Sequence, residues 1–431
     1  MRDTKASQWK GEISKAVPRI SPDSARAHWP GKDEIMRILN TRNSQMVICV
    51  ATILLASNVT ALAQPPDNAA LLYYQVFLQY EEPNQPIRWM LSDFCKGEIA
   101  SNEVIAQHIK ENRHVIDRAV KAADILKCDW GYDCSQAIVD VNAPTLPPLS
   151  RIAILLSAEA RCLAEQGGYT TALDRCVTLR KIALHACNKT LTWYLLGNQI
   201  NRIANETTQY VLGFTPGDID ELTRLRSRLT QIEAKFPSLG SSLTQEAHMW
   251  VATMDKDKVQ PLVRLLEGSL MAYSLEPKLK RIRKGDDTFF ERNRDYYLNA
   301  MATFVNTLES GLPYAQMCTK LDGLVEKWSQ EAEDNPDAIL TEFFFPMRTQ
   351  LYQSMIRQQT HLNAIKTAID LYVVKGRTGQ LPDALPPDSP RDLFSGRPFE
   401  YAKTDGGFIL RCQGKEDPKK DELHEYKFKV K

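Results

Sequence analysis

Apolar residues recur at intervals of three and four positions from about residue 68 to residue 372, the spacing that places them on one face of an α-helix. One stripe consists of Ile105, Ile109, Ile116 and Val120. Another runs from Ile219 to Phe236. The residues before it predict where this helix begins: Thr215 as the N-cap, Pro216 in the first turn, and Asp218 as the acidic residue of a pattern like a capping box. The spacing predicts amphipathic helices throughout this part of the chain.

Two helical stretches between about Leu149 and Asn188 are separated by the pair Gly167-Gly168, which predicts a helical hairpin. Gly167, Tyr169 and Ala172 resemble the central turn of a tetratricopeptide repeat, in which small residues let two helices pack closely. Residue 206, one repeat later, is a glutamate, and no second copy follows at the repeat period of about 34 residues. We therefore expect a solenoid-like helical layer rather than a regular repeat array.

The pattern changes after Val374. Residues 375–390 are rich in glycine and proline, and three short strands are then predicted at Phe399 to Tyr401, Phe408 to Arg411 and Tyr426 to Val430. In the last strand apolar residues alternate with lysines, which is typical of a half-buried edge strand. The expected fold class is therefore mainly α: a multi-helical body of helical-hairpin, TPR-like type with a small C-terminal α+β module.

The C-terminal segment resembles the end of the type II secretion major pseudopilins, where a helix, a proline-containing loop, a D-P-[WF]-G-x-P-x-x-Y turn and a β-hairpin follow in that order. About 70 residues carry the likeness, and the matching positions are Leu381, Pro382, Asp392, Phe394, Gly396, Pro398, Tyr401, Gly407 and Phe408. The same tail recurs in uncharacterised exported bacterial proteins with a long helical region before it. The chain after residue 63 as a whole is similar to that group.

Several departures argue against a pilus subunit. A pseudopilin begins with a peptidase site, Gly-Phe-Thr-x-x-Glu, that leads into a long apolar helix, whereas Gly213-Phe214-Thr215 is followed here by Pro-Gly-Asp. Leu393 replaces the proline of the family turn. The acidic residues that bind calcium in pseudopilins have no clear counterparts among Asp405, Glu416 and Asp417. We expect the module to serve as a structural or docking unit.

Residues 36–63 have the three parts of a secretory signal peptide. Arg37 and Arg42 form a cationic start, Met46 to Ala56 is a short apolar run, and small residues lead to a predicted cleavage between Ala63 and Gln64. The alternative is an uncleaved anchor, but the run is shorter than the roughly 20 residues that span a bilayer. Residues 1–35 are polar and contain three prolines, and we predict that they are disordered or that translation begins at Met36.

These patterns divide the chain into four parts. Residues 1–35 are disordered or not translated, 36–63 are the signal peptide, 64–345 are an α-helical domain, and 346–431 combine a long helix with the small sheet of the pseudopilin-like module. With 43% hydrophobic residues, the chain has enough apolar material for a core in each domain.

Charge argues against a nucleic-acid partner. The full chain carries 54 basic and 53 acidic residues, and removing residues 1–63 takes away 9 basic and 5 acidic ones, which leaves a net charge of −3. A protein that coats phosphates needs a basic face. One basic run, residues 278–284, is either a patch for an anionic lipid or polyanion, or a helix end whose cations complement the helix dipole.

The predicted export bears on the cysteines, because disulfides can form and persist outside the cytoplasm. Eight lie beyond residue 63, and Cys128 and Cys134 are the candidate disulfide because they bracket the short segment CDWGYDC; the alternative is that both are free. Trp130 in this segment either makes contacts in a recognition loop or packs into the core. Four other cysteines fit helical apolar patterns and are expected in the core: Cys162, Cys176, Cys187 and Cys318.

No catalytic, cofactor-binding or metal-binding residues are predicted. The chain has no H-E-x-x-H, G-x-S-x-G, C-x-x-C, phosphate-binding loop or dinucleotide-binding glycine motif, and its histidines beyond residue 63 form no ligand pair at helical spacing. We therefore expect a non-enzymatic helical scaffold or protein-binding module of the periplasm or outer envelope, with protein partners, no cofactor and no transmembrane segment in the mature chain. The alternative is an exported hydrolase with an unrecognised active site.

Overall fold

Helices make up most of the structure, as the spacing of apolar residues predicts, and a small antiparallel sheet follows near the C-terminus. The mainly α fold class with a C-terminal α+β part is therefore confirmed. The computed structural model describes residues 67–137, 146–187, 190–215, 217–267, 272–345, 349–417, 420 and 422–430. The predictions for residues 1–35, for the signal peptide at 36–63 and for cleavage between Ala63 and Gln64 lie outside the described residues.

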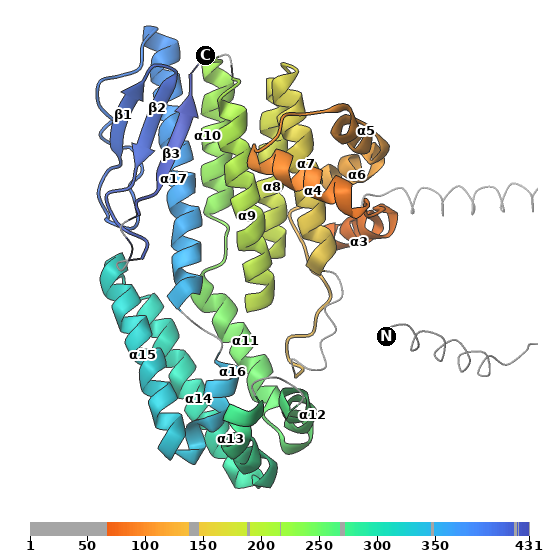
Figure 1. Cartoon of the computed structure of the whole chain (residues 1–431), viewed down its shortest axis with the longest axis vertical. Helices are drawn as coiled ribbons and strands as arrows, with labels where there is room; N and C mark the ends of the chain where they lie inside the picture. Colours follow the sequence, from red (N-terminus) through yellow and green to blue (C-terminus); the bar gives the residue numbers. More distant parts are fainter. Residues whose placement is uncertain are drawn as a thin grey trace, which may run out of the picture. The chain divides into compact units, whose positions relative to one another are not determined.

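Three long helices form the central layer: α7 (Leu146–Glu165), α8 (Tyr169–Ala186) and α9 (Leu191–Leu212) (Figure 1). The predicted hairpin is confirmed, because α7 and α8 pack together on either side of Gly167, whose φ of +85° suits glycine at the end of a helix. Helices α8 and α9 approach closely at Gly197, where a Cβ atom would lie 2.7 Å from the carbonyl oxygen of Ala183.

Four short helices cover one side of this layer: α3 (Ala69–Gln79), α4 (Gln85–Lys96), α5 (Glu103–Glu111) and α6 (Arg113–Asp124). Asn68, Asn84 and Asn102 start three of them, and the side-chain oxygen of each accepts a backbone N–H of the first turn. Their inner faces share a core with α7–α9, in which Tyr73 and Ile105 are completely buried.

The helix of the stripe from Ile219 to Phe236 begins later than the sequence predicts. In α10 (Ile219–Glu233) the N-cap is Asp218, whose carboxylate accepts the N–H groups of Asp220 and Glu221. The prediction that Thr215 is the cap is wrong, because its hydroxyl donates to the carbonyl oxygen of Val211 in α9. A carboxylate is the stronger acceptor at the positive end of a helix dipole.

Helix α11 (Leu239–Thr253) leads into a second helical group, and Figure 1 shows how these helices follow one another. The group consists of α12 (Lys256–Glu267), α13 (Ala272–Lys284), α14 (Asp287–Leu308), α15 (Tyr314–Asp334), the 3₁₀ turn η4 (Pro336–Ala338) and α16 (Ile339–Phe344). The basic run ends α13, where Lys278 pairs with Glu333 and Glu342 and Arg283 pairs with Glu276. These ion pairs favour the helix-end interpretation over a polyanion patch.

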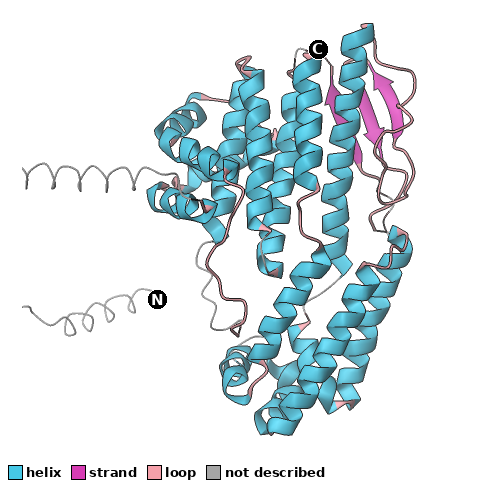
Figure 2. Ribbon diagram, turned by 180° about the vertical axis from the view of Figure 1, so that it is seen from behind, coloured by secondary structure: helices cyan, strands magenta, loops and turns pink. Residues whose placement is uncertain are grey.

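The long helix α17 (Thr349–Thr378) joins the helical body to the sheet, which lies beside it in Figure 2. The antiparallel strands are β1 (Glu400–Thr404), β2 (Gly407–Arg411) and β3 (Glu425–Lys429), in the order β1-β2-β3. The predicted alternation in β3 is confirmed, since Tyr426 and Phe428 are buried while Lys427 and Lys429 are exposed. One hydrophobic core runs without a break from α8 through α17 to these strands.

Among the helices of the described residues, none combines the length and the apolar character that crossing a bilayer requires.

Candidate functional site

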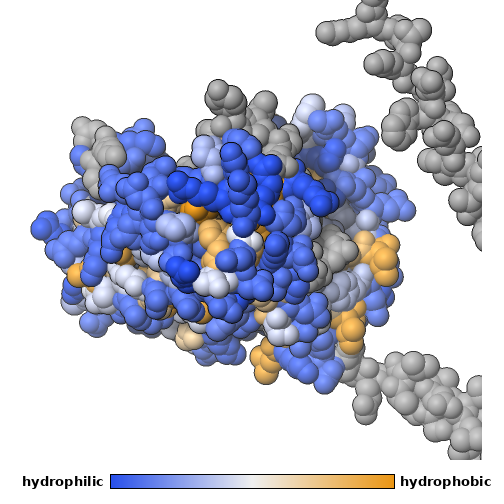
Figure 3. Space-filling view, turned by 90° about the horizontal axis from the view of Figure 1, so that it is seen from below, coloured by the Kyte–Doolittle hydropathy of each residue, from blue (hydrophilic) through white to orange (hydrophobic). Residues whose placement is uncertain are grey.

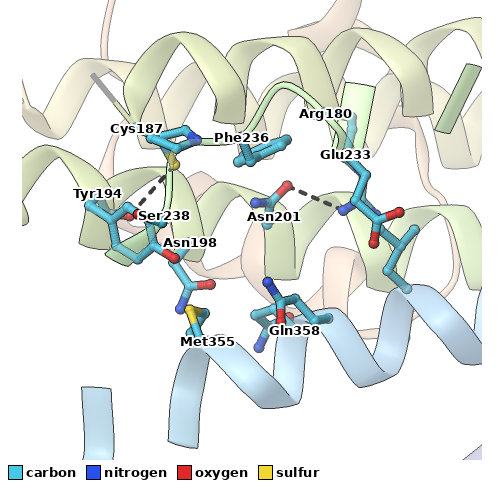
Figure 4. A pocket seen from close by; sticks show the side chains of 13 residues that line it. Arg180, Cys187, Tyr194, Asn198, Asn201, Glu233, Phe236, Ser238, Met355 and Gln358 are labelled. Atoms are coloured by element: carbon cyan, nitrogen blue, oxygen red, sulfur yellow. Dashed lines mark hydrogen bonds between the residues drawn. The ribbon is translucent and has the colours of Figure 1, made fainter. Parts of the chain in front are cut away.

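A pocket of about 200 Å³ lies between α8, α9, α17 and the connection from α10 to α11 (Figure 4). Its wall combines polar and apolar side chains: Arg180, Cys187, Tyr194, Asn198, Asn201, Glu233, Phe236, Pro237, Ser238, Met355, Gln358, Gln359 and Leu362. Pockets with convergent polar groups on an apolar wall are the usual form of small-molecule sites. We therefore regard this pocket as the first candidate site.

Arg180 is the main charged group of the wall and is only 3% exposed. Its Nη1 donates to Oδ1 of Asn201 at 3.3 Å, its Nη2 donates to Oδ1 of Asn205, and its Nε lacks a hydrogen-bond partner among the described residues. Burial lowers the pKa of Arg180 to about 10, so the guanidinium stays charged at neutral pH. Both hydrogen-bond partners of this cation are neutral amides.

Glu233 stands on the same wall, but its direct ionic partner is Lys366 of α17. The charge of Glu233 raises the pKa of Arg180, although burial has the larger, opposite effect. Lys366 is itself buried, and burial is the main cause that lowers its pKa. Arg180, Glu233 and Lys366 together carry a net charge of +1.

Amide side chains hold the two sides of the pocket together. Nδ2 of Asn205 donates to the carbonyl oxygen of Gln358 at 3.0 Å and to its Oε1 at 3.2 Å. Nδ2 of Asn198 donates to Oγ of Ser354 at 3.0 Å. These bonds fix α9 against α17, so the amides on the wall are held in place before any ligand enters. The arrangement suits binding and orientation of a small molecule.

Cys187 provides the thiol of this wall. It is 1% exposed, and burial raises its pKa well above the ordinary value for cysteine. A thiol that stays protonated is a poor nucleophile. The sequence prediction that Cys187 fills the core is therefore confirmed. The sequence analysis did not predict the other residues of the pocket, because they come from four separate elements. The one residue that could have indicated a pocket is Arg180, a charged residue on the buried face of α8.

The segment that begins at Cys128 packs inward. Trp130 is 5% exposed, its ring centroid lies 5.4 Å from that of Tyr73 and 5.1 Å from that of Trp193, and its Nε1 donates to the carbonyl oxygen of His185 at 2.9 Å. The core interpretation of Trp130 is confirmed and the recognition-loop alternative is wrong. Cys128 is half-buried and Cys134 is buried; the disulfide between them stays a prediction.

The buried environment of His185 predicts acid sensitivity. Burial lowers its pKa to about 4, whereas a histidine in the unfolded chain has a pKa of about 6.5. The unfolded chain therefore binds a proton first, and the folded state loses stability as the pH falls from about 6.5 towards about 4. Between about pH 7 and about pH 5 we expect His185 to lower the free energy of unfolding by about 2 kcal/mol.

Urea unfolding at a series of pH values checks this expectation. The variant His185→Gln should lose that part of the pH dependence, and His114→Gln, an exposed histidine, should keep it. If His185→Gln lost stability on acidification as steeply as the parent, His185 would not be the group responsible.

In the described part of the chain, no group of three or more His, Cys, Asp or Glu side chains is arranged so that it could hold a metal ion. Smaller contacts between such side chains do occur. His424 lies 2.6 Å from Glu416, which also pairs with Arg357 of α17. These contacts attach the loop before β3 to α17, so they have a structural explanation.

Asp392, in the turn that precedes β1, is completely buried. Its Oδ1 accepts the N–H of Phe394 at 2.9 Å, and its Oδ2 accepts the hydroxyl of Ser395 at 2.7 Å and the N–H groups of Gln413 and Gly414, each at 2.9 Å. A single carboxylate therefore closes the turn and fastens it to the segment after β2.

Large apolar side chains are exposed mainly on the N-terminal helices. Of the eight exposed in the described residues, six belong to residues 71–126: Leu71, Leu78, Trp89, Ile99, Val104 and Leu126. We call these six the N-terminal apolar surface. On the face seen in Figure 3, apolar side chains form separate patches in a mostly hydrophilic surface. Where exposed apolar side chains lie together in one patch, the patch is typical of a surface that contacts another molecule.

Comparisons with known proteins add no relative. No family model matches the chain, and no curated protein or solved structure matches it.

Proposed function

We propose that this protein is a non-enzymatic helical binding module of the bacterial cell envelope, which docks a protein partner on its N-terminal apolar surface. The observation that carries the proposal is the exposure of Leu78 and Leu126, each 87%, and of Trp89, 62%. A single exposed apolar residue is ordinary on a protein surface, but several that lie together in one patch are typical of a surface that contacts another molecule.

The position of these residues suits one docking region. Leu71 and Leu78 are seven residues apart on α3, so they lie on one face of the helix. The N–H of Ala69 donates to the carbonyl oxygen of Lys127 at 2.8 Å, which brings the segment of Leu126 against the first turn of α3. Trp89 lies on the neighbouring α4.

Charge indicates the nature of the partner. Residues 67–137 contain 11 acidic and 7 basic residues, a net charge of −4, so this segment accounts for the whole negative charge of the chain beyond residue 63. An acidic surface is repelled by anionic lipid headgroups. A protein segment with apolar side chains flanked by lysine or arginine is complementary to it in both respects.

Export is part of the same proposal. Cleavage between Ala63 and Gln64 would release a chain that begins just before the compact unit, which spans Pro66–Lys431. In the periplasm or outer envelope, the disulfide between Cys128 and Cys134 would tie the ends of the loop that carries Trp130.

The C-terminal part is proposed to be a pseudopilin-like module used for structure or docking. The support is the order of its elements: α17, a loop, the turn closed by Asp392, and the hairpin of β1 and β2. Because α17 packs on α9 and α10, the module is held against the helical body.

Photo-crosslinking in the native host tests the docking proposal. With p-benzoylphenylalanine in place of Leu78, we expect one saturable adduct with a different protein. Its yield in isolated envelopes should fall as salt rises from about 50 to about 500 mM, because screening weakens the charge complementarity. The matched control carries the same crosslinker at Leu298 of α14, which is also exposed.

Two results would count against the proposal. One is an adduct of equal yield from position 298, which would indicate non-specific labelling. The other is an adduct that consists only of a second copy of this chain or of lipid.

A further inference from the structure

The electrostatic setting of the pocket beside Arg180 is left unexplained by a docking role. A guanidinium that is 97% buried would ordinarily contact a carboxylate, because an uncompensated buried charge is costly. Here its two hydrogen-bond partners are the amide oxygens of Asn201 and Asn205, while Glu233 pairs with Lys366. Because Glu233 is paired with Lys366, which lies outside the pocket wall, Arg180 is left as a cation without a carboxylate partner, at the point where Figure 4 shows it bonded to Asn201.

The donors that remain on Arg180 match a carboxylate. A guanidinium has five N–H groups in a plane, four of them on the two Nη atoms, and the two bonds to amides leave two Nη hydrogens unused. Nε has no partner among the described residues although it is buried. An Nη hydrogen that the two amide bonds leave unused can donate to a carboxylate oxygen, and a bond between two charged groups is stronger than one between neutral groups.

The size of the pocket and its apolar wall limit the rest of the ligand. Phe236, Met355 and Leu362 provide apolar contacts, while Asn198 and Gln358 provide hydrogen-bonding groups. A volume of about 200 Å³ is below the roughly 300–1,000 Å³ of sites for drug-sized ligands. The occupant is thus a small molecule and not a polymer segment.

The charges around the pocket also favour a ligand with one negative charge over a phosphate monoester. Arg180, Glu233 and Lys366 sum to +1, which one carboxylate neutralises. A phosphate monoester carries close to two negative charges at neutral pH, and Glu233 on the same wall would repel the second. Arg180 also helps to lower the pKa of His361, after the larger effect of burial, so this histidine adds no positive charge to the region at neutral pH.

We propose that this pocket binds a small monocarboxylic acid with an apolar body, whose carboxylate contacts Arg180 and whose body lies against Phe236 and Met355. The site is separate from the N-terminal apolar surface, so the two proposals stand or fall independently.

Isothermal titration calorimetry on the purified chain tests the proposal with matched probe pairs: hexanoate against hexanamide, benzoate against benzamide, and phenylacetate against phenylacetamide. Members of a pair have nearly the same shape and differ in charge. At least one acid should bind with a dissociation constant about tenfold or more below that of its amide. Hydrogen exchange should then slow in α9 around Asn201 and in α17 around Gln358.

The diagnostic variant is Asn201→Asp. It places a carboxylate of the protein beside Arg180, which satisfies the cation from within and should weaken binding of the acid about tenfold or more without lowering the melting temperature. Asn299→Asp makes the same change in charge at an exposed position of α14 and should leave binding unchanged. This design avoids removal of Arg180, which risks unfolding.

Three outcomes would overturn the proposal. The first is that no acid binds with a dissociation constant below about 10 mM, because an affinity weaker than this would not support a binding site. The second is that acids and amides bind equally well, so that charge has no role. The third is that Asn201→Asp binds the acid as the parent does, so that the ligand lies elsewhere.

Discussion

Replacing Asp392 by alanine is expected to reduce the free energy of unfolding of the C-terminal part by about 4 kcal/mol, because a hydrogen bond to a charged group contributes about 1.5–3 kcal/mol and its loss leaves buried donors unpaired. Four donors depend on this carboxylate, three of them backbone N–H groups. Urea unfolding followed by the signal of the C-terminal part measures the loss. Hydrogen exchange at Phe394 and Gln413 should accelerate with it.

Two further variants make the prediction specific. Asp392→Asn keeps one acceptor oxygen and should lose less stability than Asp392→Ala. Asp388→Ala removes an exposed carboxylate from the same loop and should change stability by less than about 0.5 kcal/mol. If Asp388→Ala were as damaging as Asp392→Ala, the loop as a whole and not the buried carboxylate would be the sensitive feature.

Replacing Trp130 by alanine is expected to cost about 3–5 kcal/mol, the usual range for deleting a large buried aromatic side chain. Its ring stacks with Tyr73, Phe77 and Trp193, so its loss opens a cavity within the core that α3 shares with α8 and α9. Urea unfolding of the purified chain, followed by circular dichroism, gives the change.

The matched comparison uses a tryptophan of opposite burial. Trp89 is 62% exposed, so Trp89→Ala should change stability by less than about 0.5 kcal/mol. Trp130→Phe keeps an aromatic ring but loses the hydrogen bond to the carbonyl oxygen of His185, and about 1 kcal/mol should be lost through that bond alone. Equal losses from Trp89→Ala and Trp130→Ala would contradict the packing described for this core.

The sequence was sufficient for the fold class because each main element has a local signal. The Gly167-Gly168 pair marks the α7–α8 hairpin, and the alternation of Tyr426 and Phe428 with lysines marks β3. These signals depend on neighbours within a few residues. The start of α10 was placed wrongly because Thr215 and Asp218 are both acceptable caps, and the choice between them depends on the contact of Thr215 with α9.

The candidate sites depend on long-range contacts, so the sequence could not locate them. Arg180 and Gln358 are far apart in the chain and come to one pocket only after α17 packs against α9 and α10. The N-terminal apolar surface was equally hidden, because helical spacing places Tyr73 and Leu78 in the same helix without saying that the first is buried and the second exposed. Two of the four hydrogen-bond donors to Asp392 come from the segment after β2, and the spacing of apolar residues along the chain cannot predict such a contact.

The most direct test of an envelope role is the N-terminus of the protein recovered from fractionated cells of its native host. Intact-mass measurement should give a chain that begins at Gln64 or an immediate neighbour, in the envelope fraction. A chain that retains residues 46–56, or one recovered from the cytosol, would contradict export and with it the proposed disulfide and the envelope partner.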